Sequence, residues 1–142
     1  MKINKDLIIS DTNKTLYNVT EDLSTLFNYG EISSVVTSGN NVAIKFTNGI
    51  MICHGRHSTG NVACGNAWGG TYASNTINGY TYASAFKTEP AVVLSFTSSG
   101  MNGWLMSIGG GSTTQTPTYQ LIRGTSATIS GYTSYIAIGT WE

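Results

Sequence analysis

The sequence predicts an all-β protein on three grounds: its composition, the period of its apolar residues and its turns. The 142 residues include 16 Ser, 20 Thr and 17 Gly but only 2 Pro, and β-branched Thr, Val and Ile favour strands. From Ile32 onward, apolar and polar residues alternate in short runs separated by Gly and Asn. Many short strands at this spacing indicate an antiparallel sandwich or barrel. The length fits one main domain, since domains cluster at roughly 100–150 residues.

Charged residues are few, and most of them lie near the N-terminus. They make up 10% of the chain, with a formal net charge of +0, where an ordinary globular chain has about 25%. Binding to a phosphate backbone needs a basic surface, so we expect neither nucleic acid nor an anionic membrane as a partner. Eight of the 14 charged residues precede Ile32. This shift places a boundary near Gly30, between an N-terminal segment (1–31) and a main domain (32–142).

The apolar runs are too short to cross a membrane. The longest, such as 91–94 and 136–138, fall far below the roughly 18 residues that a spanning helix needs. The opening Met1-Lys2-Ile3-Asn4 begins no signal-peptide pattern. We therefore expect no membrane insertion and no export signal.

The N-terminal segment carries the one convincing helix signal. Asn18 and Glu21 form a capping pattern, and the apolar residues around them follow spacings of 3, 4 and 3. This heptad rhythm predicts a short helix with one apolar stripe. The stripe consists of Leu16, Val19, Leu23 and Leu26. It suits a trimerising stalk, and it equally suits a helix packed on its own domain.

The clearest strand signals flank Asn48-Gly49. Apolar residues alternate over 42–46, and a second run, Ile50-Met51-Ile52-Cys53, follows the Asn-Gly pair. An Asn-Gly pair between two such runs is a strong hairpin signal, because a type I′ turn needs positive φ at both central residues. We predict a hairpin centred on Asn48-Gly49.

Later runs predict further strands. Val92, Leu94 and Phe96 share one face of a run, Asn102-Gly103 resembles a turn, and 109–117 has the composition of a flexible loop. Trp104, Met106 and Ile108 share a face of the next run. The last predicted strands are 119–122, 127–130 and 133–139.

One short repeat occurs in the chain. Thr71-Tyr72-Ala73-Ser74 returns as Thr81-Tyr82-Ala83-Ser84, on either side of Asn78-Gly79. We expect the two copies to be the arms of a second hairpin, since similar cross-strand pairs stabilise a sheet.

Signatures of catalysis are missing from the sequence. It has no Gly-x-Ser-x-Gly, no phosphate-cradling loop with a Lys and no Gly-x-Gly-x-x-Gly. From Ile32 onward the acidic residues are Glu89 and Glu142, too few for the paired carboxylates of a glycosidase. We expect a protein that is not an enzyme and that needs no cofactor.

Cys53, His54, His57 and Cys64 are the right residue types for zinc. Their spacing is poor, because the adjacent Cys53 and His54 would point to opposite faces of a strand. Two cysteines are also too few for a disulfide scaffold. We expect no metal site, with Cys53 buried and the histidines at the surface.

Aromatic residues crowd the Gly- and Asn-rich stretch from Gly65 to Ser84. Flat rings beside amides and hydroxyls suit neutral sugars, and ligand contacts concentrate on loops. The candidate ligand-binding residues are Trp68, Tyr72, Tyr80 and Tyr82. The alternative is that these rings are half-buried packing residues of strands.

Three motifs together resemble one known family. They are Asn48-Gly49-Ile50-Met51-Ile52, Phe86-x-x-x-Pro90-x-Val92-Val93 and Tyr135-Ile136-Ala137-Ile138-Gly139. In this order they look like the C-terminal head domains of bacteriophage and prophage tail fibres, which are similar to the H-type lectin sandwich. The resemblance covers the chain from Ile32 to Trp141.

The resemblance implies a β-sandwich head that works as a homotrimer and performs no chemistry. Its role would be a receptor-binding fibre tip that recognises a host cell-surface glycan, with other tail or fibre proteins as partners. Its location would be the virion tail, after synthesis in the bacterial cytoplasm. The rival interpretation is a structural cap that trimerises or folds the fibre and binds no ligand.

Overall fold

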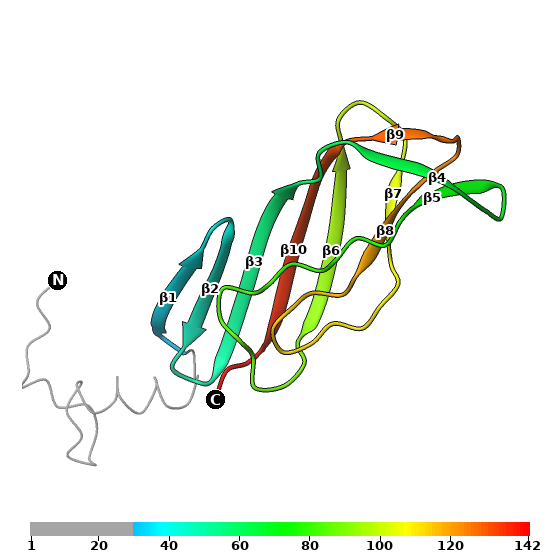
Figure 1. Cartoon of the computed structure of the whole chain (residues 1–142). Coiled ribbons are helices and arrows are strands. Elements are labelled where there is room, and N and C mark those ends of the chain that lie inside the picture. Colours follow the sequence, from blue (N-terminus) through cyan, green and yellow to red (C-terminus); the bar gives the residue numbers. More distant parts are fainter. Residues whose placement is uncertain (1–29) are drawn as a thin grey trace, which may run out of the picture.

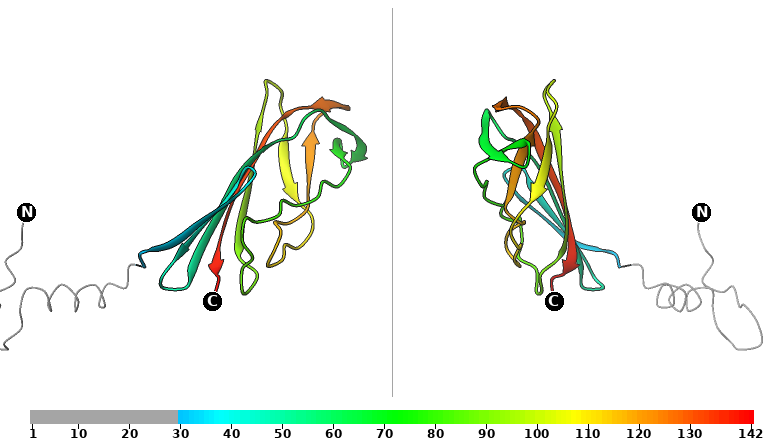
Figure 2. Two further views of the ribbon diagram at one scale, coloured as in Figure 1. Left: turned by 60° about the vertical axis from the view of Figure 1, so that its left-hand side comes forward. Right: turned by 90° about the vertical axis from the view of Figure 1, so that its right-hand side faces the viewer.

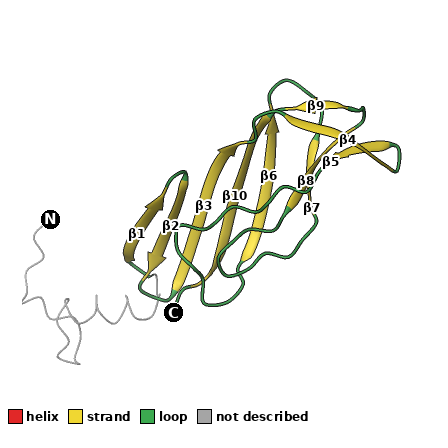
Figure 3. Ribbon diagram, viewed as in Figure 1, coloured by secondary structure: helices red, strands yellow, loops and turns green. Residues whose placement is uncertain are grey.

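The computed structural model describes residues 30–142, which form two antiparallel five-stranded sheets (Figures 1 and 3). The first sheet, in spatial order, is β1 (Ile32–Ser38), β2 (Asn41–Phe46), β3 (Ile50–Ser58), β10 (Gly131–Thr140) and β6 (Ala91–Ser98). The second is β7 (Trp104–Ser107), β8 (Tyr119–Arg123), β5 (Thr71–Ser74), β4 (Val62–Trp68) and β9 (Ala127–Ile129). The side views show the second sheet on one side of the first (Figure 2).

The predicted all-β antiparallel sandwich is therefore confirmed. Within residues 30–142 the structure has no helix long and apolar enough to span a bilayer. The predicted stalk helix and its apolar stripe lie outside the described residues. The boundary near Gly30 stays a prediction.

The hairpin around Asn48-Gly49 is present. β2 and β3 pair antiparallel, with Ile44 opposite Ile52. Three residues, 47–49, connect the two strands. Gly49 has a φ of 83°, and its N–H donates to the Phe46 carbonyl oxygen at 3.1 Å. This geometry matches a three-residue loop that ends in a left-handed glycine, not the two-residue type I′ turn.

The second predicted hairpin was wrong. β5 pairs with β4 and β8, whereas 81–84 forms no strand. Asn78-Gly79 does not form a turn either. Gly79 lies so close to the 109–117 loop that a Cβ there would overlap the carbonyl oxygen of Thr116. The chain instead crosses the first sheet over residues 75–90 (Figure 1). The two copies of the repeat have the same local strand propensity, but their backbones pair with different parts of the chain.

The crossing segment 75–90 pairs with the predicted loop ahead of β8. The Thr116 N–H donates to the Tyr80 carbonyl oxygen at 3.0 Å, and the Tyr82 N–H donates to that of Thr114 at 2.9 Å. These bonds satisfy backbone groups that lie outside regular strands. The crossing segment and the loop together cover the part of the first sheet that the second sheet leaves open.

The core consists of two clusters. One lies between the first sheet and the crossing segment: Ala43, Met51, Cys53, Tyr82, Phe86, Tyr135 and Ala137. The other lies between the sheets: Cys64, Tyr119, Leu121 and Ile129. Leu94 packs against both clusters. On β7 the core residue is Leu105, so Trp104 and Met106 face the other way.

Candidate binding surfaces

Trp68 stands at the end of a hairpin that projects from the sandwich (Figure 1). β4 and β5 meet there through Gly69 and Gly70, with φ of 53° and 84°. The Trp68 side chain is 54% exposed, and the Thr71 hydroxyl donates to its carbonyl oxygen at 2.6 Å. A tight, bonded turn thus presents a flat apolar ring to solvent.

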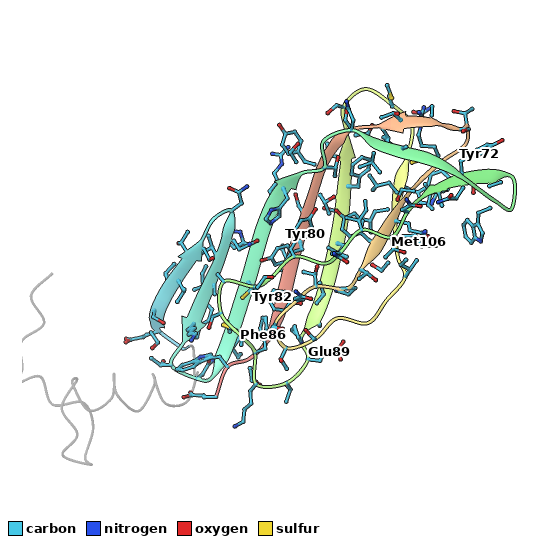
Figure 4. The ribbon with its side chains drawn as sticks, in the orientation of Figure 1. Tyr72, Tyr80, Tyr82, Phe86, Glu89 and Met106 are labelled. Atoms are coloured by element: carbon cyan, nitrogen blue, oxygen red, sulfur yellow. The ribbon has the colours of Figure 1, made fainter. Side chains whose placement is uncertain are left out.

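Tyr72 belongs to the same hairpin but not to the same face. It lies opposite Ala67, whereas Trp68 lies opposite Thr71, so the register points the two rings to opposite sides. The Tyr72 ring packs against the second core cluster. Figure 4 shows it well separated from Tyr80 and Tyr82.

Tyr80 and Tyr82 come from the crossing segment, above β3, β10 and β6 (Figure 4). Tyr82 is a core residue, 5% exposed, in edge-on contact with Phe86 at 5.0 Å between centroids. Among residues 30–142 its hydroxyl finds no hydrogen-bond partner, and burial raises its pKa to about 12. Tyr80 is half-buried and its hydroxyl bonds that of Tyr119 at 2.6 Å. The structure therefore places Tyr80 and Tyr82 together on the crossing segment, away from the hairpin. Of the four aromatic candidates, Trp68 has the exposed ring.

Beneath Tyr80, an amide oxygen joins three elements of the first sheet. The Asn41 Oδ1 accepts a bond from the Tyr135 hydroxyl at 2.9 Å and contacts His57 Nε2 at 2.7 Å. An amide oxygen only accepts, so His57 carries a proton on Nε2. Burial lowers the pKa of His57 and raises that of Tyr135. This cluster connects β2, β3 and β10 within the first sheet.

The cysteine and histidine residues do not come together. Cys53 lies in the first core cluster and Cys64 in the second, both with free thiols. His54 faces away from Cys53 on β3, as alternation requires. Burial raises the pKa of both thiols. Among residues 30–142, no three His, Cys, Asp or Glu side chains are grouped to hold a metal ion.

A large apolar surface lies on the outer side of the first sheet, around the exposed His54 and up to the row of Arg56, Ser134 and Ser95. One cross-strand row runs from Val35 through Ile44 and Ile52 to Ile138. We define the outer apolar face as Val35, Val42, Ile44, Ile50, Ile52, Val93, Ile136 and Ile138. Within it, Val93 is 69% and Ile136 52% exposed. Contiguous exposed apolar surfaces of this kind mark interaction sites.

Sequence reasoning missed this surface. The signal was present, because 50–53 and 91–94 are continuously apolar, which indicates strands with two apolar faces. The core uses Met51 and Cys53, and the other face receives Ile50 and Ile52.

No family model matches the chain, and no curated protein matches it. A solved structure does: the Pseudomonas aeruginosa R1 pyocin fibre comprising C-terminal residues 323–701. The match has a TM-score of 0.55 and 15% sequence identity, and covers 94% of this chain and 35% of that chain. At this identity the likeness concerns the fold. The chain has a β-sandwich fold similar to a part of the pyocin fibre and spans about a third of that chain's length.

Proposed function

We propose that this protein is the receptor-binding tip of a phage-tail-like fibre, acting as a homotrimer that binds a host cell-surface saccharide without catalysing a reaction. The likeness of its fold to part of the pyocin fibre carries the proposal, together with the tail-fibre motifs of its sequence. Its location would be the tail of the particle, attached to other fibre proteins.

The outer apolar face supports the oligomer. A second copy of the chain is the occupant that fits it, because permanent interfaces are large and apolar and most oligomers are homo-oligomers with closed symmetry. The face extends over all five strands of the first sheet. Three as the number of copies follows from the tail-fibre resemblance.

The projecting hairpin supports saccharide binding. Trp68 offers a ring face, and the hairpin also carries an amide pair, in which Asn66 Nδ2 donates to Asn75 Oδ1 at 3.0 Å. Sugars present apolar C–H faces and hydroxyls, which match rings and amides. Repetition over three subunits raises weak single-site affinity through avidity.

The alternative, a structural cap without a ligand, draws support from Tyr80 and Tyr82. Both pack within the chain, as structural residues do. The two functions differ in whether exposed Trp68 has a ligand.

An array of bacterial surface glycans tests this choice. The parent chain should bind a defined subset of glycans, and Trp68→Ala should lose that binding while keeping the oligomer. Trp104→Ala is the matched control, since Trp104 is 48% exposed on β7, and it should bind like the parent. Equal binding by parent and Trp68→Ala would contradict the assigned ring, and no binding by the parent would favour the cap.

A further inference from the structure

A cleft of about 760 Å³ opens next to the first residue of β2, Asn41. Pairing of β2 with β3 stops at Asn41 opposite Gly55, while β3 continues to Ser58. The last residues of β3 therefore have a neighbouring strand on the β10 side alone. The cleft lies in this step, with Asn40 of the β1–β2 turn among the residues that line it.

The cleft is lined by polar side chains together with Ile136 and the rings of Tyr132 and Tyr135. Its polar side chains continue along the first sheet from the outer apolar face. Arg56 lies opposite Ser134 in the register, and Ser58 lies opposite Tyr132. The neighbouring positions on β6, Ser95 and Thr97, complete two polar rows. Beyond Ile136 the outer surface of the first sheet thus changes from apolar to hydroxyl-bearing.

Arg56 lies over an aromatic ring in this cleft. Its guanidinium carbon lies 4.4 Å from the centroid of the Tyr132 ring. A cation–π contact with the ring uses none of the N–H donors of the guanidinium in a hydrogen bond, so they remain available to an anion. The fork of these donors matches a carboxylate, with which arginine forms two parallel bonds.

The acidic side chains of the described chain lie elsewhere. Glu31 and Glu142 are at the 47–49 turn, where Glu31 bonds Thr47 and Glu142 touches Gly49. Glu89 lies just before β6, whose first residue pairs with Ile138. All three sit toward the opposite end of the first sheet from Arg56. Residues 30–142 therefore place no carboxylate beside the Arg56 guanidinium.

We propose that this cleft binds the carboxylate of a sugar acid, with Arg56 as the anion-binding residue. A single guanidinium matches the single charge of a carboxylate better than the charge of about −1.5 to −2 on a phosphate monoester. The hydroxyls of Ser58 and Ser134 would bond the hydroxyls of the sugar, at the end of the sheet beyond the outer apolar face. The cleft lies on the first sheet, whereas Trp68 lies on the hairpin of the second sheet. Loss of binding at one of these two sites therefore leaves binding at the other unchanged.

Titration of the full chain with two disaccharides, followed by NMR and calorimetry, tests the site. One probe carries glucuronate and the other carries glucose at the same position. The glucuronate probe should bind more tightly, and Arg56→Gln should weaken it about tenfold or more, since a charge-assisted bidentate pair is lost. Lys87→Gln, which removes the same charge from an exposed lysine elsewhere, should leave both probes unchanged.

Arg56→Lys separates geometry from charge. It should bind the glucuronate probe more weakly than the parent, because an ammonium lacks the planar fork. Unchanged oligomeric state and unfolding midpoint in all variants would show that the fold is intact. Equal affinity for the two probes, or no effect of Arg56→Gln, would overturn the proposal. Tighter binding of glucose 6-phosphate than of glucuronate would overturn the carboxylate assignment.

Discussion

The imidazole of His57 lies flat against the ring of Tyr80, with centroids 4.0 Å apart and planes 8° apart. His57 belongs to β3 and Tyr80 to the crossing segment. The stack therefore connects the two layers of the first core. The Tyr135 ring lies beside the stack and nearly parallel to it, 6.3 Å from the His57 ring and 6.1 Å from the Tyr80 ring. The same imidazole meets Asn41 Oδ1 at 2.7 Å.

This stack predicts a loss of stability in acid. Burial lowers the pKa of His57 below its ordinary value of 6.5, so the unfolded chain binds the proton more readily than the folded one. The contribution of His57 to the free energy of unfolding should be constant above about pH 7 and should fall as the pH drops below the unfolded pKa.

Urea unfolding as a function of pH measures this effect. In His57→Gln, the free energy of unfolding should depend less on pH than in the parent. His54 is an exposed histidine on the other face of β3, so His54→Gln should keep the pH dependence of the parent. The same slope in parent and His57→Gln would show that other groups cause the acid sensitivity.

Gly55→Ala should destabilise the fold. A Cβ at this position would lie 2.7 Å from Tyr135 Cε1 and would also overlap the Asn41 amide oxygen. Such overpacking costs about 1–3 kcal/mol. Gly65→Ala on β4 is the control, because a Cβ there meets nothing within 4 Å. Chemical denaturation at equal protein concentration compares them, and equal stability of the two variants would contradict the close approach at Gly55.

Two buried tyrosines should respond differently to removal of their hydroxyls. Tyr82→Phe removes a buried hydroxyl that has no partner in the described part of the chain, so the stability of this variant should equal or exceed that of the parent. Tyr135→Phe removes the bond to Asn41 and should cost about 0.5–1.5 kcal/mol. Thermal and urea unfolding of both variants check this, and a larger loss for Tyr82→Phe would mean that its hydroxyl has a partner.

Val93→Glu should dissociate the oligomer. Val93 is the most exposed member of the outer apolar face, so a charge there is harmless in a monomer and unfavourable in an apolar interface. Ser95→Glu, two residues along the same strand face at the polar end, should stay assembled. Sedimentation equilibrium should give three times the chain mass of 15.1 kDa for the parent and for Ser95→Glu. A monomeric parent would contradict the homotrimer.

The fold class and the first hairpin could be predicted because their signals are local. Gly49 takes a left-handed conformation that favours glycine, and the alternation on either side fixes two strands. The crossing segment could not be predicted in the same way. Tyr82 is held in the core by backbone pairing with Thr114, which lies more than thirty residues further along the chain. No pattern in the sequence around Tyr82 predicts that partner.

The candidate site was predicted only in part, for the same reason. Trp68 is exposed because it lies at the turn that Gly69 and Gly70 form, and these glycines directly follow it in the sequence. The cleft at Arg56 depends on β2 starting opposite Gly55, while β3 continues to Ser58. Sequence alternation gives the face of a residue on a strand, but not where its neighbouring strand ends.

Binding of the full chain to bacterial cells, before and after periodate oxidation of their glycans, tests the proposed function most directly. Flow cytometry over a panel of strains should find at least one that the labelled chain binds. That binding should disappear after periodate, persist after protease treatment of the cells, and be lost with Trp68→Ala but not with Trp104→Ala. Binding that survives periodate and disappears with protease, or an absence of binding to every strain, would contradict a saccharide-binding fibre tip.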